Sequence, residues 1–328
     1  MIISQTPFRL SFFGGGTDFR NFYQEYGGAV LSTTIDKYCY VNVRHLPHFF
    51  DYATELSYSK IERVKSIDEI EHPAIRVAMK EMHVENIRLT YEADLPARSG
   101  LGTSSSFAVG MLHAFHAMQG RYITKKELAD QAIRLERDLC NEPGGIQDQI
   151  AVAYGGFNRI DFSSDGYTVK PVIMTDERKR MLNDRMLLFF SGFSRFSGDI
   201  QAEVMSKVSS NAGVLLEMKH LVDEAEKVLS VGADMSVFGD LLDVSWRLKR
   251  GISERISNNT IDAVYEIAKK NGARGGKVLG AGGGGFMLFY AEPEYHNGIK
   301  EALKEYLHVP FCFEHSGTRV LYADSQGV

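Results

Sequence analysis

Glycine and hydroxyl residues gather in the stretch ARSGLGTSSSF, residues 97–107, directly before a strongly apolar segment. Small residues let a backbone approach a ligand closely, and the start of a helix offers unpaired N–H groups and a partial positive charge. The stretch therefore predicts an anion site, for which phosphate is the usual occupant. Ser and Thr are also common at helix N-caps, so a purely structural cap is an equal alternative on this stretch alone.

A second set of candidates is acidic and lies in LERDLCNEPGGIQDQ, residues 135–149. Glu136 falls near the end of an expected helix, and Asp148 follows the helix-stopping turn at 143–145. A carboxylate beside a glycine turn can contact a ligand closely, and a second carboxylate nearby can hold a hard cation such as Mg²⁺. Each of them taken alone is more often a surface charge.

Two further glycine-rich stretches are PFRLSFFGGGTDF, residues 7–19, and LGAGGGGF, residues 279–286. In the first, Asp18 is either the polar residue of an Asx-turn or a hydrogen-bond partner for a polyhydroxylated substrate. The second matches the dinucleotide pattern G-x-G-x-x-G, but the strand-like FMLFY follows it, so no helix N-terminus is available for a pyrophosphate. This excludes a nicotinamide-dependent dehydrogenase. Five glycines in six positions indicate that another backbone or a ligand lies against them.

The motifs of two large groups of phosphate-transferring enzymes are missing. Residues 100–106 contain no Lys-Ser/Thr after a glycine, which disfavours a P-loop NTPase. The sequence also has neither the H-R-D-L-x-x-x-N nor the D-F-G motif of the protein kinases.

Composition describes an ordinary globular chain of 328 residues, with 44% hydrophobic and 24% charged residues. The net charge of −5 argues against nucleic acid as a partner. Three widely separated cysteines without metal or redox spacing indicate a reducing compartment. The N-terminus lacks the form of a signal peptide, and the apolar runs are too short to span a bilayer, so we expect a cytoplasmic protein without a membrane partner.

The elements that must position these residues follow from the hydrophobic pattern. We expect strands over 2–13, 39–46, 87–95 and 185–192, and a hairpin from 153–162 and 167–174. We expect helices over 104–118 and over 124–139, the latter beginning with a capping box. Long helices continue to about residue 270, and the chain closes with strand, glycine loop, strand, helix and strand. The fold class is therefore α+β.

Taken in order, the three glycine-rich motifs resemble those of the GHMP family of small-molecule kinases. TPFRLSFFGGGTD, residues 6–18, is similar to the N-terminal motif of that family, and LGAGGGGF is similar to its C-terminal glycine motif. LPARSGLGTSSS, residues 95–106, is similar to the P-x-x-x-G-L-G-S-S-A phosphate loop, with Thr103 for the usual first Ser and Ser105 for the usual Ala. The resemblance covers nearly the whole chain.

The resemblance implies a two-lobed fold with ATP in the cleft: a ribosomal-protein-S5-like N-terminal lobe over 1–184 and a ferredoxin-like C-terminal lobe over 185–328. It implies Asp148 as the catalytic base, Arg9 as its cationic partner, and Ser104 and Glu136 as Mg²⁺ ligands. The nucleotide would contact Arg98, Ser99, Gly100, Leu101, Gly102, Thr103, Ser104, Ser105 and Ser106. The substrate would contact Gly15, Gly16, Thr17, Asp18, Arg195, Gly282, Gly283 and Gly284.

Within the family, GGGTD and the stretch 275–290 look most like the D-glycero-D-manno-heptose 7-phosphate kinases and the related fucokinase branch. The implied activity is ATP-dependent phosphorylation of the anomeric hydroxyl, which gives a 1,7-bisphosphate for nucleotide-activated heptose and surface polysaccharide synthesis. A phosphorylated sugar needs a cationic pocket, for which Arg20, Arg195 and Lys277 are candidates. Alternatives are a fucokinase- or galactokinase-type enzyme, a mevalonate-type enzyme, and a catalytically silent sugar sensor. The sequence predicts no oligomeric state.

Overall fold

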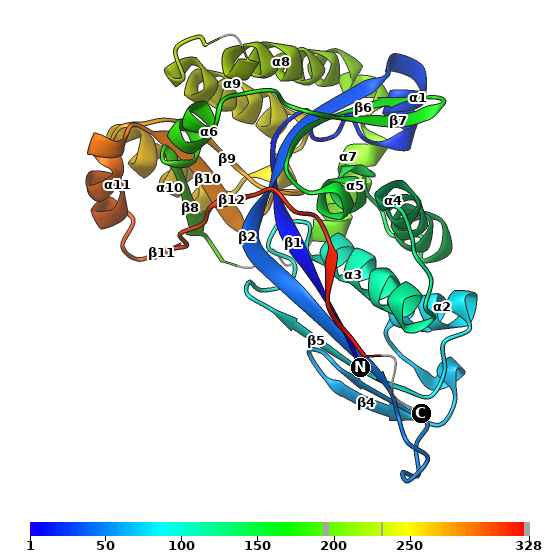
Figure 1. Ribbon diagram of the computed structural model, residues 1–328. Coiled ribbons are helices and arrows are strands. Elements are labelled where there is room, and N and C mark those ends of the chain that lie inside the picture. Colours follow the sequence, from blue (N-terminus) through cyan, green and yellow to red (C-terminus); the bar gives the residue numbers. More distant parts are fainter. Residues whose placement is uncertain (193–196, 231, 325–328) are drawn as a thin grey trace.

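A long antiparallel pair of strands, β1 (Ile2–Phe13) and β2 (Gly28–His45), crosses the molecule diagonally in Figure 1. The computed structural model describes residues 1–192, 197–230 and 232–324. The expected strand over 2–13 is confirmed. The strand expected over 39–46 is the second part of the longer β2. β2 pairs with β6 (Phe157–Ser163) along its first part and with β5 (Ile87–Ala93) along its second.

In the described ranges, nine strands form the first sheet. Six of them follow the order β13-β1-β2-β5-β3-β4, β6 and β12 also pair with β2, and β7 pairs with β6. The β6–β7 hairpin is confirmed, and its first strand begins after the helix that ends at Tyr154. The remaining strands of this sheet are β3 (Thr54–Ser57), β4 (Ile61–Val64), β5 (Ile87–Ala93), β6 (Phe157–Ser163), β7 (Gly166–Pro171), β12 (Phe313–Glu314) and β13 (Arg319–Ala323).

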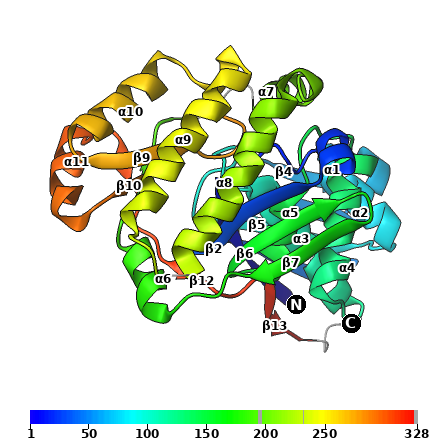
Figure 2. The same cartoon turned by 90° about the horizontal axis from the view of Figure 1, so that it is seen from above.

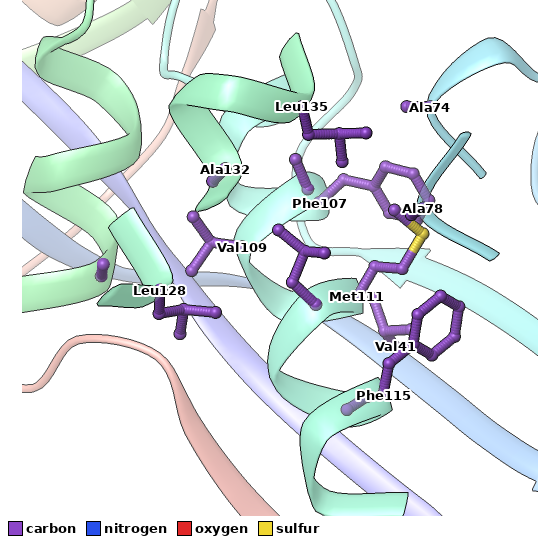
Figure 3. Close-up of a cluster of buried hydrophobic side chains, with 14 of the residues drawn as sticks. Val41, Ala74, Ala78, Phe107, Val109, Met111, Phe115, Leu128, Ala132 and Leu135 are labelled. Carbon is purple, nitrogen blue, oxygen red and sulfur yellow. The ribbon is translucent and has the colours of Figure 1, made fainter. Parts of the chain in front are cut away.

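Helix α3 (Thr103–Met118) packs directly on β1 and β2 and confirms the expected helix over 104–118. Gly110 allows the close approach, since a Cβ there would lie 2.7 Å from the Thr6 hydroxyl of β1. Figure 3 shows Phe107, Met111 and Phe115 of this helix within a buried cluster that includes residues of α2 and α4. The other helices of this half are α1 (Arg20–Tyr26), α2 (Pro73–Met82), α4 (Lys125–Ile133) and α5 (Gln147–Tyr154).

The helix expected over 124–139 changes type part-way. The capping box is confirmed: Thr124 and Glu127 satisfy each other's backbone N–H groups at the start of α4. Residues Arg134–Leu139 (η2) then form a π-helix, and the Cys140 N–H donates to the Leu135 carbonyl at 2.9 Å. Such wide turns are uncommon and occur often at functional sites. Glu136 lies in this turn.

In the described residues of the second half, a smaller antiparallel sheet has the order β11-β8-β10-β9. Figure 2 shows α8, α9 and α10 lying side by side, and α8 and α9 contact strands of the first sheet as well as each other. The elements are α6 (Asp176–Asn183), β8 (Met186–Phe190), α7 (Ser197–Ser206), α8 (Ala212–Ser230), α9 (Ser236–Ile252), α10 (Asn259–Lys270), β9 (Ala273–Val278), β10 (Phe286–Ala291), α11 (His296–Ala302) and β11 (Leu307–His308). Short 3-10 turns lie at Ile67–Glu69, Ser209–Asn211, Glu254–Ile256 and Pro293–Tyr295.

A shared apolar core joins the two sheets. Phe12 and Phe13 of β1 pack edge-on against Phe238 of α9, with ring centroids 5.4 and 5.1 Å apart. The same cluster continues to Phe286 of β10. Apolar burial of this kind is the main favourable term in folding, so it fixes the surfaces that face each other across the junction of the sheets.

The end of the chain returns to the first sheet. β13 pairs with β1, and β12 pairs with β2. Met1 and Asp324, the first and last residues that the structure describes, therefore lie side by side and exchange backbone hydrogen bonds. The division of the chain at residue 184 stays a prediction. The α+β class is confirmed. Of the helices in the described ranges, none has both the length and the apolar character that crossing a bilayer requires.

Candidate active site

An arginine and an aspartate from distant parts of the chain form a two-pronged ion pair. Nε and Nη2 of Arg9 donate to Oδ1 and Oδ2 of Asp148, each at 2.7 Å, and Nη1 donates to the Gly100 carbonyl at 2.7 Å. Arg9 is 3% exposed, whereas the Asp148 side chain is 21% exposed. Because a carboxylate has about four lone-pair positions, Asp148 keeps acceptor capacity on its open side.

The local sequence explains how these two residues meet. Arg9 lies in β1, and Asp148 lies in the first turn of α5, directly after the glycine turn at 144–145. Gly102 passes over the pair: a Cβ there would lie 3.2 Å from Cγ of Arg9 and 3.4 Å from Oδ2 of Asp148, and its φ is +71°. Only glycine takes up this conformation readily at such a close approach.

Asp18 is the second carboxylate of the site. It is 2% exposed, and it accepts hydrogen bonds from the N–H groups of Gly16 at 2.9 Å and Gln147 at 3.1 Å. The first of these comes from the residue two positions before Asp18, whereas an Asx-turn would use the N–H two positions after it. The second links the glycine turn after β1 to the start of α5. Burial, together with the nearby Asp148, raises the pKa of the Asp18 carboxyl. Asp18 also lines the pocket described below, which is the position that a hydrogen-bond partner for a substrate needs.

The expected phosphate loop precedes α3 and has three positive φ angles, at Arg98, Gly100 and Gly102. Its backbone is held by the first sheet, since the Arg9 N–H donates to the Leu101 carbonyl at 3.0 Å. The Ser99 hydroxyl is fully buried and has no hydrogen-bond partner among the described residues. Water or a bound group usually supplies the missing partner of such a hydroxyl.

The C-terminal glycine stretch lies directly against this loop. A Cβ on Gly100 would lie 2.3 Å from the Leu279 carbonyl oxygen, and a Cβ on Gly285 would lie 2.4 Å from the Ser99 carbonyl oxygen. The Phe286 N–H donates to the backbone carbonyl of Ser99 at 3.0 Å. The expectation that another backbone or a ligand lies against these glycines is thus met by a backbone, which is that of the phosphate loop.

Glu136 and Ser104 meet at the start of α3. The Ser104 hydroxyl donates to Oε1 of Glu136 at 2.8 Å, while Ser105 at 2.7 Å and Nε2 of Gln149 at 2.5 Å donate to Oε2. Glu136 is 1% exposed, and Ser104 is exposed. A carboxylate and a hydroxyl are hard oxygen donors, so their chemistry fits Mg²⁺.

A pocket opens between the two sheets, and both carboxylates line it. Lys249 of α9 donates through Nζ to the Gly280 carbonyl, and Lys277 of β9 donates to the Phe12 carbonyl at 2.7 Å. Burial and the positive charge of Arg9 lower the pKa of Lys249 to about 8, against the opposing effect of Asp18 and Asp148. Burial, with Lys249 and Arg9 nearby, lowers the pKa of Lys277 well below its usual value. The lining consists of Arg9, Ser11, Gly15, Gly16, Asp18, Phe19, Arg137, Gly145, Gln147, Asp148, Gln201, Val204, Lys249, Ile252, Ile256, Lys277, Gly280 and Ala281.

Comparison with known proteins places this geometry in a family. The family models for the GHMP kinases N-terminal domain and the GHMP kinases C-terminal domain match residues 66–156 and 223–309. A D-glycero-alpha-D-manno-heptose 7-phosphate kinase of Campylobacter jejuni is 31% identical over 97% of this chain and 98% of its own length. The chain belongs to the GHMP kinase family.

Solved structures agree with the GHMP kinase assignment. The crystal structure of a D-glycero-D-manno-heptose 1-phosphate kinase from Bacteroides thetaiotaomicron matches with a TM-score of 0.78 at 26% identity, over 99% of this chain and 100% of that one. A galactokinase of Lactococcus lactis, complexed with galactose, has a TM-score of 0.72 at 17% identity, over 97% of this chain and 94% of that one. The second likeness concerns the fold alone. The two-lobed GHMP kinase fold expected from the motifs is thereby confirmed.

The structure brings many of the expected GHMP kinase residues together. Gly15, Gly16 and Asp18 line the pocket with Asp148. Thr17 does not, because it is fully buried and its hydroxyl donates to the carbonyls of Gly14 and Ala29. In the loop, the hydroxyl oxygen of Thr103 accepts from the Arg98 N–H at 3.3 Å.

Other expected residues lie apart from the Asp148 pocket. Gly282, Gly283 and Gly284 do not line it. The Gly283 N–H donates to the Ile256 carbonyl at 2.9 Å, and Gly283 and Gly284 line a second hollow beside the start of α10. Arg20 is paired with Asp138 at 3.1 Å and does not line the pocket either. Arg195 lies outside the described residues.

Sequence reasoning missed Arg137, Lys249 and Gln147 as pocket residues. Arg137 follows Glu136 directly in a charged run, and Lys249 lies in an ordinary amphipathic helix. Nothing in the sequence around either residue therefore indicates a place in the pocket. For Gln147 a signal existed in GIQDQ, because the residue beside a helix-start aspartate lies at the same turn. Its amide oxygen accepts from the Ser11 hydroxyl at 2.6 Å and ties α5 to β1.

Proposed function

We propose that this protein is an ATP-dependent sugar kinase that phosphorylates the anomeric hydroxyl of D-glycero-D-manno-heptose 7-phosphate and yields the 1,7-bisphosphate. The observation that carries the proposal is the Arg9–Asp148 pair, whose open carboxylate faces the same pocket as Asp18. The similarity to the heptose 7-phosphate kinase of Campylobacter jejuni over nearly the full length of both chains supports this choice of sugar.

Asp148 is the proposed general base. It accepts the proton of the attacking hydroxyl, while the two hydrogen bonds from Arg9 fix its orientation. Asp18, held rigidly by the N–H groups of Gly16 and Gln147, accepts hydrogen bonds from sugar hydroxyls. The two carboxylates thus divide proton removal and substrate positioning between them.

The phosphates of ATP are proposed to lie on residues 98–106. The loop ends at the start of α3, where unpaired N–H groups and the partial positive charge of the helix favour an anion. The buried, unpartnered hydroxyl of Ser99 gives the loop an additional polar group for a ligand. Contact with the loop from the glycines at 280 and 285 keeps its backbone in place.

Mg²⁺ is the proposed cofactor, with Ser104 and Glu136 as its ligands. When bound, the ion would offset negative charge on the ATP phosphates. Among the described residues, no group of three or more His, Cys, Asp or Glu side chains could hold a metal by itself. When the ion is bound, phosphate and water oxygens would therefore supply most of its coordination, as is usual for Mg²⁺ in phosphate-transferring enzymes.

Lys249 and Lys277 are proposed to stabilise the charge that develops on the transferred phosphoryl group. Both line the pocket, and both interact electrostatically with Arg9. Phosphoryl transfer asks mainly for positioning and for neutralisation of charge, which fixed cations provide without reorganisation. Because the reaction consumes ATP, we place the enzyme in the cytoplasm.

A coupled ADP-release assay tests the proposed function across heptose 7-phosphate, fucose, galactose and mevalonate. We expect kcat/KM to be highest for heptose 7-phosphate. Higher turnover of fucose or galactose would instead assign another anomeric sugar kinase, and ATP binding without turnover of any sugar would indicate a sensor. The Asp148→Asn variant serves as the control for contaminating kinases.

A further inference from the structure

A second arginine enters the pocket without a close acidic partner. Arg137 lies in the π-helical turn after α4, and its side chain is 14% exposed. Nε donates to the Gly145 carbonyl at 2.9 Å, and Nη1 donates to the Glu142 carbonyl at 3.2 Å. The nearest carboxylate oxygen, Oε2 of Glu142, is 4.0 Å away on a side chain that is 42% exposed. No described residue accepts a hydrogen bond from Nη2, so a largely buried positive charge keeps an open donor.

The surroundings of Gly144 show what lies beside that donor. A Cβ on Gly144 would lie 3.1 Å from Nη2 of Arg137 and 2.9 Å from Oε1 of Gln201, which belongs to α7. The guanidinium and the carboxamide therefore meet at one glycine, and both line the pocket that contains Asp148. The carboxamide can turn its NH₂ group toward an anion, so both side chains supply donors there.

Gly145 connects this place to the proposed sugar site. Its carbonyl accepts from Arg137, and a Cβ on it would lie 1.8 Å from Oδ2 of Asp18. A substrate whose hydroxyls contact Asp18 would thus extend along Gly145 toward Arg137.

The other cations of the pocket are already engaged near the reacting pair. Three N–H groups of Arg9 donate hydrogen bonds to Asp148 and Gly100. Lys249 and Lys277 donate to backbone carbonyls and interact electrostatically with Arg9. The guanidinium of Arg137, in contrast, is held by the carbonyls of Glu142 and Gly145, and its Nη2 group remains open. A planar guanidinium matches phosphate oxygens better than any other side chain.

We propose that Arg137, with Gln201 beside it, binds the phosphate that the sugar substrate already carries. The inference rests on the proposed function and extends it, because it assigns the residues that select a sugar phosphate over a free sugar. Arg137 acts as a specificity residue and takes no part in proton transfer.

The test compares kcat/KM for D-glycero-D-manno-heptose 7-phosphate with kcat/KM for the same heptose without its phosphate. In Arg137→Gln we expect the preference for the phosphorylated sugar to fall about a hundredfold, because one buried partner of a charged contact is lost. The KM for ATP should stay near the wild-type value, since the proposed nucleotide loop over 98–106 is a separate segment. Arg134→Gln is the matched control, since Arg134 lies in the same turn but is 57% exposed and pairs with Glu81.

A second variant guards against collapse of the loop that Arg137 supports. Gln201→Glu leaves the bonds of Arg137 to residues 142 and 145 in place and adds a negative charge beside the proposed phosphate, so it should lower the same preference. If the wild type prefers the phosphorylated sugar and both variants keep that preference, the phosphate subsite is overturned and the kinase assignment stays intact. A wild-type enzyme that makes no distinction between the two sugars would overturn the phosphorylated substrate and the subsite together.

Discussion

Gly145 and Asp18 are so close that no side chain fits between them: a Cβ on Gly145 would lie 1.8 Å from Oδ2 of Asp18. The same carboxylate oxygen accepts the N–H of Gln147 at 3.1 Å. The turn before α5 therefore wraps around the Asp18 carboxylate and fixes it at the wall of the pocket.

Gly145→Ala should displace Asp18 and impair use of the sugar. We expect kcat/KM for the sugar to fall about a hundredfold, because a shift of an ångström in a positioning group costs that much. The KM for ATP should change little, since the phosphate loop is a separate segment. Gly213→Ala is the control, because nothing lies within 4 Å of a Cβ at that position. Equal sugar kinetics in both variants would contradict the role given to the Gly145–Asp18 contact.

Asp148→Asn should abolish proton transfer while the fold and the nucleotide site persist. We expect kcat to fall by about 10²–10⁴, the range that a general base contributes, and ATP affinity measured by calorimetry to stay close to that of the wild type. Asp138→Asn is a matched control, because Asp138 is an exposed partner of Arg20 outside the pocket. Turnover of Asp148→Asn at the wild-type rate would remove Asp148 as the base.

The sequence predicts the parts of the site that are carried by unusual local composition. The glycine-rich loops, the helix after Thr103 and the turn before Asp148 all depend on residues with special backbone freedom, so short stretches are enough to find them. Asp148 and Glu136 could be proposed for the same reason, because each lies beside such a turn or at a helix end.

What the sequence alone could not predict depends on tertiary contact. Gly282–Gly284 are as glycine-rich as the phosphate loop, yet Gly282 and Gly283 pack against Ile256 and not beside Asp148. Thr17 belongs to the GGGTD motif but serves the turn itself, since its hydroxyl is bonded to backbone carbonyls. Arg137 and Lys249 become pocket residues only because η2, α9 and the first sheet meet at the pocket, and residue type gives no indication of that meeting.

Ser104→Ala should raise the Mg²⁺ concentration needed for half-maximal activity by about tenfold, because it removes one of the two proposed oxygen ligands of the ion. Thermal stability should be nearly unchanged, since Ser104 is exposed. Ser105→Ala provides the comparison: its hydroxyl donates to the other, buried oxygen of Glu136, so its loss should cost about 1 kcal/mol of stability. A Mg²⁺ titration and a melting curve on each variant separate the two effects. An unchanged Mg²⁺ requirement in Ser104→Ala would exclude Ser104 as a ligand.

Lys249 should give the enzyme a descending limb in its pH–rate profile. Burial and the charge of Arg9 lower the pKa of Lys249 to about 8, so it loses its positive charge as the pH rises through that value. If that charge stabilises the transferred phosphoryl group, kcat/KM of the wild type falls above about pH 8. Lys249→Met should be slower by about 10²–10³ at pH 7 and should lack this limb. An identical limb in the variant would assign the titration to another group.

The same lysine should affect stability in the opposite sense. The unfolded chain holds the Lys249 proton up to about pH 10.5, whereas the folded protein releases it at about pH 8. Between these values the unfolded state binds more protons, so the contribution of Lys249 to the free energy of unfolding rises with pH. Relative to Lys249→Met, the wild type should therefore gain thermal stability from pH 8 to 10.5 while it loses activity. Lys304→Met, at a side chain 70% exposed, is the control. If the melting temperatures of wild type and Lys249→Met change in parallel across this range, the folded protein does not lower the pKa of Lys249.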